Sequence, residues 1–263
     1  MKAGRKIWCV ICVLSLLGCV ICGCTAWNYR QQRIKEQKRY DEIRENVKQI
    51  SAWWQPLSVS AEEVLQDETE LQQVPVDFDA LKEINDDIYA WITLPGTEID
   101  YPVLQSEEED FYLNHDVDRN ESISGAIYSQ TLNKKDFSDF LTVLYGHDMK
   151  DYSMFGSLLL LEEESVFQKN NVIQIYLPEE TIEYRIFAAY VASSEHLLDE
   201  FDQESKLEKK AYLAEIAYLC KEEDTFDQDV FNRITTDDNI LTLSTCYHGD
   251  KSRRFLVQAV RVN

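Results

Sequence analysis

From residue 97 onward the chain consists of short segments rich in β-branched and aromatic residues, which polar turns separate. These segments are residues 98–104, 124–129, 141–145, 172–177, 181–191, 239–245 and 254–262. Their length and composition are typical of strands. So many short strands in succession favour an antiparallel barrel or sandwich, and this pattern limits the fold more than any other feature of the sequence.

Two segments of this region, and one that precedes it, have helical rather than strand character. Apolar residues recur at helical spacing within residues 205–223, at Leu207, Ala211, Ala214, Ile216, Leu219 and Cys220. Residues 154–163 predict a shorter helix. Residues 79–92 predict another, which would end before Leu94-Pro95-Gly96.

Three reactive residue types fall at the ends of predicted strands. In residues 242–246, Thr-Leu-Ser-Thr-Cys, alternation puts Ser244 and Cys246 on the same face, so the thiol leaves the sheet where a loop begins. An arginine opens the next strand. About a hundred residues upstream, an apolar run ends in Gly146 and His147. A free thiol is largely protonated at neutral pH, so a cysteine nucleophile needs a base or a cation beside it.

These motifs resemble those of class B sortases, which are cell-surface transpeptidases of Gram-positive bacteria. The resemblance extends over about residues 77–262 and rests on several motifs in the order of the family. They are Leu-Tyr-Gly-His at 144–147, Ser-Met-Phe-Gly at 153–156, Thr-Leu-Ser-Thr-Cys at 242–246 and the arginine that follows, with Tyr-Pro-Val at 101–103, Tyr-Leu-Asn-His-Asp at 112–116 and Ser-Gly-Ala-Ile at 124–127.

The resemblance implies a mainly β fold: a sortase-like antiparallel β-barrel with N-terminal helices and a helix inserted before the cysteine strand. It also implies that Cys246 is the nucleophile, His147 the general acid and base, and Arg254 the oxyanion or substrate anchor. Ser244 and Leu113 match positions that line the peptide groove of the family. The family's acidic residues after the cysteine are missing, because Tyr-His-Gly stands at 247–249. No metal or organic cofactor is implied.

The activity implied by the resemblance joins a surface protein to an amine of peptidoglycan or of its precursor. Cys246 would cleave a C-terminal sorting signal of a surface protein after its threonine and form a thioester. An amine of peptidoglycan or of its lipid-linked precursor would then accept the protein. Three alternatives stay open: a pilin-polymerising sortase, a cysteine hydrolase that uses water, and an inactive extracellular binding module. In the last case Cys246 would react with thiol reagents no faster than a buried Cys220.

A nearly uncharged run of 21 residues, 7–27, predicts a membrane segment near the N-terminus. A lipoprotein signal is the alternative, because Leu16-Leu17-Gly18-Cys19 follows a basic start. Basic residues after the run outnumber those before it, which by itself would place the domain in the cytoplasm. The resemblance implies a single-pass protein of the cell membrane with an extracellular domain, and we follow it.

The chain divides into three parts on these grounds: residues 1–29 as membrane anchor, 30–76 as juxtamembrane helix and linker, and 77–263 as catalytic domain. In the middle part, Tyr40, Ile43, Val47, Ile50 and Trp54 form one apolar stripe of an amphipathic helix. We expect this stripe to pack on the domain.

The charge balance excludes one class of partner. The whole chain has a net charge of −22, and residues 1–55 hold ten of the 26 basic and four of the 48 acidic residues, which leaves −28 for residues 56–263. Because a domain with this negative charge repels phosphate backbones, nucleic acid is not expected as a partner. Five of the seven cysteines lie in the apolar run. The other two, Cys220 and Cys246, could pair, but a buried helical cysteine and a catalytic one explain them equally well.

Overall fold

The computed structural model describes residues 2–48, 74–169, 171–194, 198 and 201–262, and it describes the side chains from residue 14 onward. The chain forms two compact units, Met1–Ile43 and Arg44–Asn263. The first unit consists of α1 (Lys2–Val47), whose last turn belongs to the second unit. The part of the chain whose side chains are described contains no helix that is long and apolar enough to cross a membrane. Residues 7–13 of the predicted anchor lie outside that part.

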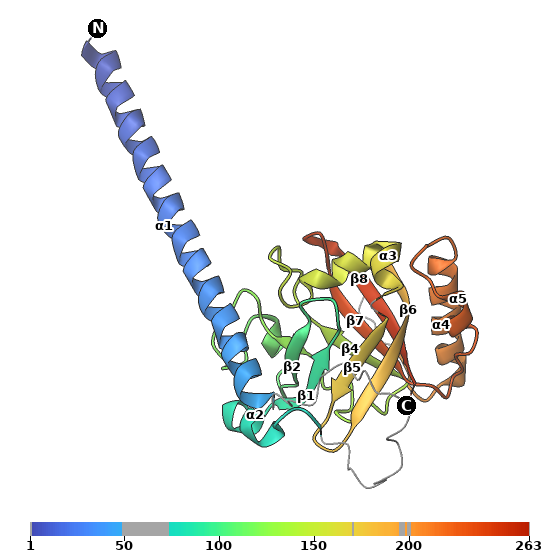
Figure 1. Ribbon diagram of the computed structural model, residues 1–263. Coiled ribbons are helices and arrows are strands. Elements are labelled where there is room, and N and C mark those ends of the chain that lie inside the picture. The colour runs from blue at the N-terminus through green and yellow to red at the C-terminus, as the bar shows by residue number, and fades with distance from the viewer. Residues whose placement is uncertain (1, 49–73, 170, 195–197, 199–200, 263) are drawn as a thin grey trace, which may run out of the picture. The chain divides into compact units, whose positions relative to one another are not determined.

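The second unit is built around eight described strands (Figure 1). The strands are β1 (Ile88–Thr93), β2 (Asp100–Leu104), β3 (Ile127–Tyr128), β4 (Leu141–Tyr145), β5 (Val172–Tyr176), β6 (Thr181–Ser193), β7 (Ile240–Tyr247) and β8 (Asp250–Arg261). The helices are α2 (Phe78–Ile84), η1 (Phe111–Leu113), η2 (Gly156–Glu162), α3 (Glu164–Phe167), α4 (Lys206–Cys220) and α5 (Gln228–Phe231), of which η1 and η2 are 3₁₀ helices.

The strands close into a barrel in the order β1-β2-β3-β4-β7-β8-β6-β5, which confirms the predicted mainly β barrel. Most neighbours run antiparallel, but β2 pairs with β3 and β4 pairs with β7 in parallel. A parallel pair has both strands ending at the same edge of the sheet. The β4–β7 pair therefore brings the ends of two predicted functional segments together.

The helix predicted over residues 79–92 is wrong in its second half. α2 ends at Ile84, and β1 begins at Ile88. The side chain of Asn85 accepts a hydrogen bond from the backbone N–H of Asp87 at 3.0 Å, a local turn that competes with further helix. All β1 residues except Ala90 are β-branched or aromatic, and nearly all are buried. Strand pairing on both edges therefore outweighs the local helical pattern.

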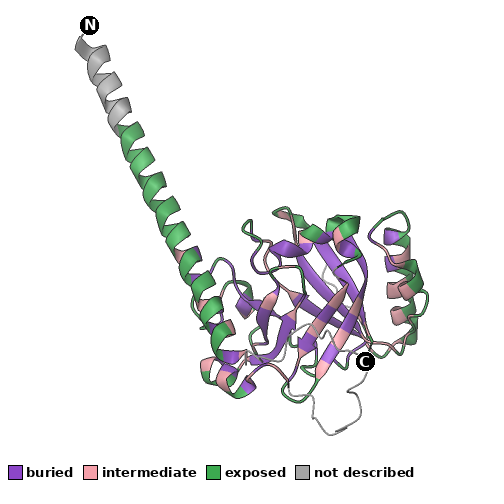
Figure 2. Cartoon of the chain, in the orientation of Figure 1, coloured by how far each residue is buried: buried purple, intermediate pink, exposed green. Residues whose placement is uncertain are grey.

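α4 is the helix predicted before the cysteine strand, and it lies with α5 against one side of the barrel (Figure 1). Its buried residues Ile216 and Cys220 pack on a cluster from β4, β6, β7 and β8. The predicted apolar side is only partly correct, since Leu207 is 79% exposed and Leu219 also faces solvent. Figure 2 shows the same contrast between buried strands and the exposed outer side of α4.

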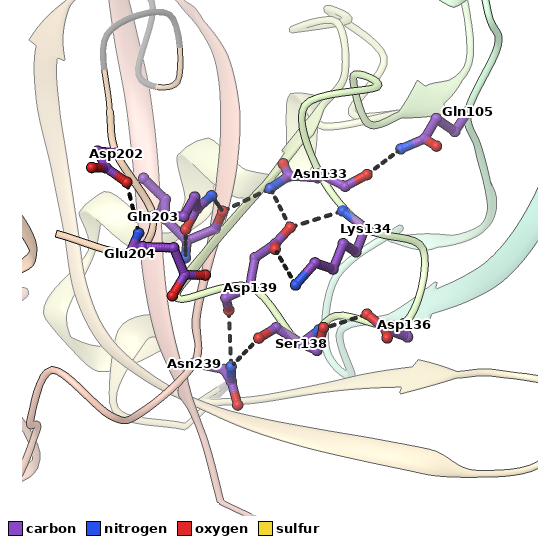
Figure 3. Close-up of polar contacts among 11 residues, drawn as sticks. Gln105, Asn133, Lys134, Asp136, Ser138, Asp139, Asp202, Gln203, Glu204 and Asn239 are labelled. Atoms are coloured by element: carbon purple, nitrogen blue, oxygen red, sulfur yellow. Dashed lines mark hydrogen bonds and ion pairs between the residues drawn. The ribbon is translucent and has the colours of Figure 1, made fainter.

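Side chains replace a strand partner at the beginning of β4 (Figure 3). Because β3 pairs with β4 only at Tyr128 and Tyr145, the earlier residues of β4 need other partners. Asn133 accepts from the N–H of Val143 at 2.9 Å and donates to the carbonyl of Leu141 at 2.7 Å. The side chain of Gln203, which precedes α4, accepts a hydrogen bond from the N–H of Leu141 and donates one to its carbonyl. These amides tie the connection before α4 to the barrel.

The apolar stripe predicted over residues 40–54 is only partly described. α1 ends at Val47, which is buried, while Ile50 and Trp54 lie outside the described residues, as does most of the predicted linker. At the beginning of the second unit, the ammonium of Lys48 contacts Asp100 at 2.5 Å, and the indole N–H of Trp91 donates to the same oxygen at 2.7 Å. These contacts fix the end of α1 to β1 and β2.

Candidate active site

Cys246 and Arg254 face each other across the β7–β8 hairpin. They are direct partners in the antiparallel register, and Nη1 of Arg254 lies 3.6 Å from Sγ of Cys246. Two pairs further along the same face, Thr242 and Gln258 are covered by Tyr212 of α4, which hydrogen-bonds both. The helix therefore shields the middle of the hairpin and leaves the pair of Cys246 and Arg254 partly exposed.

His147 reaches the same end of the barrel through the parallel pairing of β4 with β7. Tyr145 lies beside Ser244, and the N–H of Gly146 donates to the carbonyl of Ser244 at 3.2 Å. The two chains leave the barrel side by side, with His147 two residues beyond Tyr145 and Cys246 two residues beyond Ser244. The fold thus brings together all three reactive residues that the sequence placed at strand ends.

The imidazole of His147 contacts a backbone carbonyl rather than the thiol. Its Nε2 lies 2.6 Å from the oxygen of Leu113. Since a carbonyl only accepts, Nε2 carries the proton, and Nδ1 is the nitrogen free to exchange one. No hydrogen bond between His147 and Cys246 is present among the described residues. Leu113 belongs to η1, so this short helix holds the imidazole in place.

Two glycines allow the close packing around His147. Gly125 has a φ of 55°, and a Cβ there would lie 2.5 Å from the carbonyl oxygen of Tyr112 and 2.7 Å from that of Leu113. At Gly146, a Cβ would lie 2.5 Å from Cδ1 of Ile127 and 2.8 Å from the ring of Phe155. Larger residues would therefore displace the segments on both sides of the imidazole.

One cleft contains every residue that the sequence analysis proposed for the site: Cys246, His147, Arg254, Ser244 and Leu113. Ser244 is buried in its wall, whereas Leu113 is 45% exposed at its edge. The sequence analysis missed the remaining lining residues, which are Asp110, Tyr128, Gln130, Tyr145, Gly146, Ser193, Ser194, Thr245 and Leu256. Tyr145, Gly146 and Thr245 stood within quoted motifs, but no local pattern marks Asp110 or the two serines.

The turn after Cys246 is linked to the loop that bears His147. The carboxylate of Asp148 accepts a hydrogen bond from the N–H of Gly249 at 3.2 Å. Burial raises the pKa of Asp148 above its usual range, although this hydrogen bond and His248 oppose the shift. His248 lies 3.4 Å from Glu162 and is mostly exposed. Side-chain contacts therefore join the two loops that carry the reactive residues.

The other cysteine of the domain has a different environment. Cys220 is fully buried, and both Cys220 and Cys246 are free thiols. Burial, with a contribution from Glu223, raises the pKa of Cys220 to about 12. His115 stacks on Phe111 and contacts its carbonyl at 2.8 Å, so its contacts are structural. No cluster of His, Cys, Asp or Glu able to hold a metal occurs in the described part of the chain.

The barrel matches the fold of one protein family. The sortase domain model matches residues 92–262, so the chain belongs to the sortase family. Sortase B of Listeria monocytogenes is 31% identical over 63% of this chain and 65% of its own length, just under two thirds. Sortase B of Staphylococcus aureus is 30% identical over 72% of this chain and 75% of its own.

Solved structures place the chain within the family. Sortase B from Bacillus anthracis, in complex with AAEK1, superposes on this chain with a TM-score of 0.68 at 27% sequence identity. The match covers 89% of this chain and 99% of the Bacillus anthracis chain. The Staphylococcus aureus sortase B–substrate complex gives a TM-score of 0.62 at 30% identity, covering 71% and 85%. The chain is a class B sortase, of the enzyme class of cysteine transpeptidases, as its motifs predicted.

Proposed function

We propose that this chain cleaves the C-terminal sorting signal of surface proteins after a threonine and transfers them to an amine of peptidoglycan or its precursor. The observation that carries this proposal is the pairing of Cys246 with Arg254 in a cleft that His147 also lines. This supports the proposal because a thiol, a permanent cation and an imidazole line the same cleft.

Cys246 acts as the nucleophile and forms a thioester with the threonine carbonyl. Arg254 stands 3.6 Å from the sulfur, so its N–H groups are placed to stabilise negative charge on the oxygen of the tetrahedral intermediate. Its guanidinium also donates to the carbonyls of Lys251 and Arg253 at 3.1 and 3.3 Å, which restrict its movement. Little reorganisation is then needed as the charge develops.

His147 transfers protons between the two halves of the reaction. With Nε2 donating to Leu113, Nδ1 takes the proton of the attacking thiol and passes it to the departing amine, and it later takes a proton from the incoming amine and returns it to the sulfur as the thioester breaks. Ser244 and Leu113 line the cleft and contact the bound peptide. A turn of the ring toward Cys246, away from the Leu113 carbonyl, would bring the acid closer to the leaving group.

Residues 1–29 anchor the protein in the cell membrane, residues 30–76 form a juxtamembrane helix and linker, and residues 77–263 form an extracellular catalytic domain. The support for the anchor is the apolar run at residues 7–27 behind a basic start. The tethered enzyme and an acceptor amine on a membrane-bound precursor would then meet at the same membrane surface.

The test is cleavage of a panel of quenched sorting-signal peptides by the full-length protein, with and without triglycine as amine acceptor. Cleavage is expected to disappear in Cys246→Ala and to persist in Cys220→Ala, the matched control for the loss of a thiol. Amine-linked product and a thioester on Cys246, seen by mass spectrometry, are expected as well. Cleavage that survives in Cys246→Ala would overturn the mechanism, and purely hydrolytic product at high amine concentration would indicate a hydrolase.

A further inference from the structure

Asp110 places a carboxylate in the catalytic cleft, although no sequence motif marks it. It directly precedes η1 and lines the same cleft as Cys246 and Arg254. The residue is exposed and has a φ of 55°, a left-handed conformation that aspartate and asparagine tolerate better than most residues. The turn into η1 therefore presents its side chain at the wall of the cleft.

Two donors orient this carboxylate. The hydroxyl of Tyr128 donates to Oδ1 of Asp110 at 2.9 Å, and Nε2 of Gln130 donates to the same oxygen at 3.0 Å. Burial and the nearby Asp110 raise the pKa of Tyr128, so its hydroxyl stays protonated and remains a donor. Among the described residues, Oδ2 of Asp110 has no hydrogen bond or ion pair. One oxygen is thus held by the protein, and the other is left for a ligand.

Gln130 adds a second acceptor without a donor. The residue is 3% exposed and lines the cleft. Because a carboxylate only accepts, the contact with Asp110 fixes the amide nitrogen there and turns Oε1 away. Oε1 is buried and has no hydrogen-bond partner among the described residues. Buried polar atoms of native proteins are usually satisfied, so an unpaired acceptor beside a cleft indicates a missing donor.

The cation of the cleft does not neutralise Asp110. Arg254 directs Nη1 to the sulfur of Cys246 and to the backbone carbonyls of Lys251 and Arg253, and it forms no ion pair with Asp110. The charged residues lining the cleft are Asp110 and Arg254. The cleft thus has a positive end at the thiol and a separate negative site at Asp110.

We propose that Asp110 is a specificity-determining residue that binds a primary ammonium group of a substrate. The inference deepens the proposed function, on which it rests. The ammonium group has two possible sources in that reaction: a lysine side chain of the sorting peptide, or the acceptor amine in its protonated form. Both present the same N–H-rich cation to Oδ2.

Binding can be tested without catalysis, so that failure of the proposed function does not affect the result. Full-length protein labelled with ¹⁵N-glutamine is titrated with triglycine amide, and the side-chain signal of Gln130 is followed by NMR. N-acetyl-triglycine amide is the neutral probe. Saturable shifts are expected with the cationic probe and not with the acetylated one. Asp110→Asn, which keeps the shape and tolerates the same φ, is expected to weaken binding at least tenfold.

Asp136→Asn is the matched control, because Asp136 is an exposed loop carboxylate that accepts from the N–H of Ser138 at 3.0 Å and lies outside the cleft. This variant is expected to bind like the unmodified chain. Equal shifts with both probes, no shift at all, or unchanged binding by Asp110→Asn would each overturn the proposal.

Kinetics with cleavable peptides then assign the source of the ammonium group. If the acceptor binds Asp110, Asp110→Asn raises the KM for triglycine about tenfold but leaves that for hydroxylamine, which is largely neutral at pH 7.5, unchanged. If the peptide binds there, the variant lowers kcat/KM for peptides with lysine upstream of the threonine and not for those with norleucine. A change of less than twofold in both arms contradicts the specificity role.

Discussion

Arg254 and Cys246 occupy directly opposed positions on β8 and β7, with Nη1 and Sγ 3.6 Å apart. We predict that Arg254→Ala lowers kcat/KM for peptide cleavage by roughly 100-fold or more, the usual cost of removing one donor to an oxyanion. Arg254→Lys keeps the charge but loses the planar fork, so an intermediate rate is expected.

Arg253→Ala is the matched control for that prediction. Arg253 is the neighbouring arginine, and its side chain pairs with Asp250 and lies over the ring of Tyr247 instead of the thiol. The kcat/KM of Arg253→Ala for peptide cleavage is expected to stay within about threefold of that of the unmodified chain, because exposed ion pairs contribute little. Similar losses for both variants would mean that general charge, and not the position opposite Cys246, governs the reaction.

The two cysteines of the domain are predicted to differ strongly in reactivity. Burial raises the pKa of Cys220 to about 12, whereas Cys246 is partly exposed beside Arg254. Alkylation of the native full-length protein with iodoacetamide at pH 8 should modify Cys246 at least ~100-fold faster than Cys220, because Cys220 reacts only after local opening. Peptide mapping by mass spectrometry measures both rates, and unfolding in urea should equalise them. Equal rates in the native protein would favour the inactive binding module.

Much of the fold could be predicted from the sequence because its signals are local. Short strands, the helix before the cysteine strand and the positions of Cys246 and His147 at strand ends follow from patterns within a few residues. The parallel pairing of β4 with β7 does not, since strand order depends on contacts between segments far apart.

The errors have the same origin. Residues 88–93 carry a helix-like apolar spacing, but pairing with β2 and β5 makes them a strand. Asp110 and Gln130 enter the cleft only because η1 and the segment after β3 meet there, so no spacing in the sequence could relate them to Cys246. The contact of His147 with the carbonyl of Leu113 also depends on this packing.

Gly125→Ala is predicted to impair both stability and activity. A positive φ costs a β-carbon residue about 1–3 kcal/mol, and here the added Cβ would also collide with the carbonyls of Tyr112 and Leu113. Since the Leu113 carbonyl contacts His147, its displacement should lower kcat as well as the unfolding free energy. Gly249→Ala is the control, because its φ is 75° but no atom lies within 4 Å of the added Cβ. Equal stability losses would show that backbone strain alone, without the collision, accounts for the effect.

The hairpin that carries Cys246 and Arg254 is predicted to loosen in acid as Asp250 takes up a proton. Hydrogen bonds from the side chain and backbone N–H of Ser252, and from Arg253, lower the pKa of Asp250 to about 2. A carboxyl whose pKa falls on folding stabilises the protein above its unfolded value of about 3.9, and this stabilisation is lost as the pH falls toward the folded value. The unfolding free energy of Asp250→Asn should therefore lie below that of the unmodified chain at pH 7 and approach it as the pH nears 2.

Carboxyl ¹³C NMR checks the assignment directly: Asp250 should titrate near pH 2, and Asp148, whose pKa burial raises, should titrate above its usual range. Similar midpoints for the two carboxyls would contradict the hydrogen bonding of this turn.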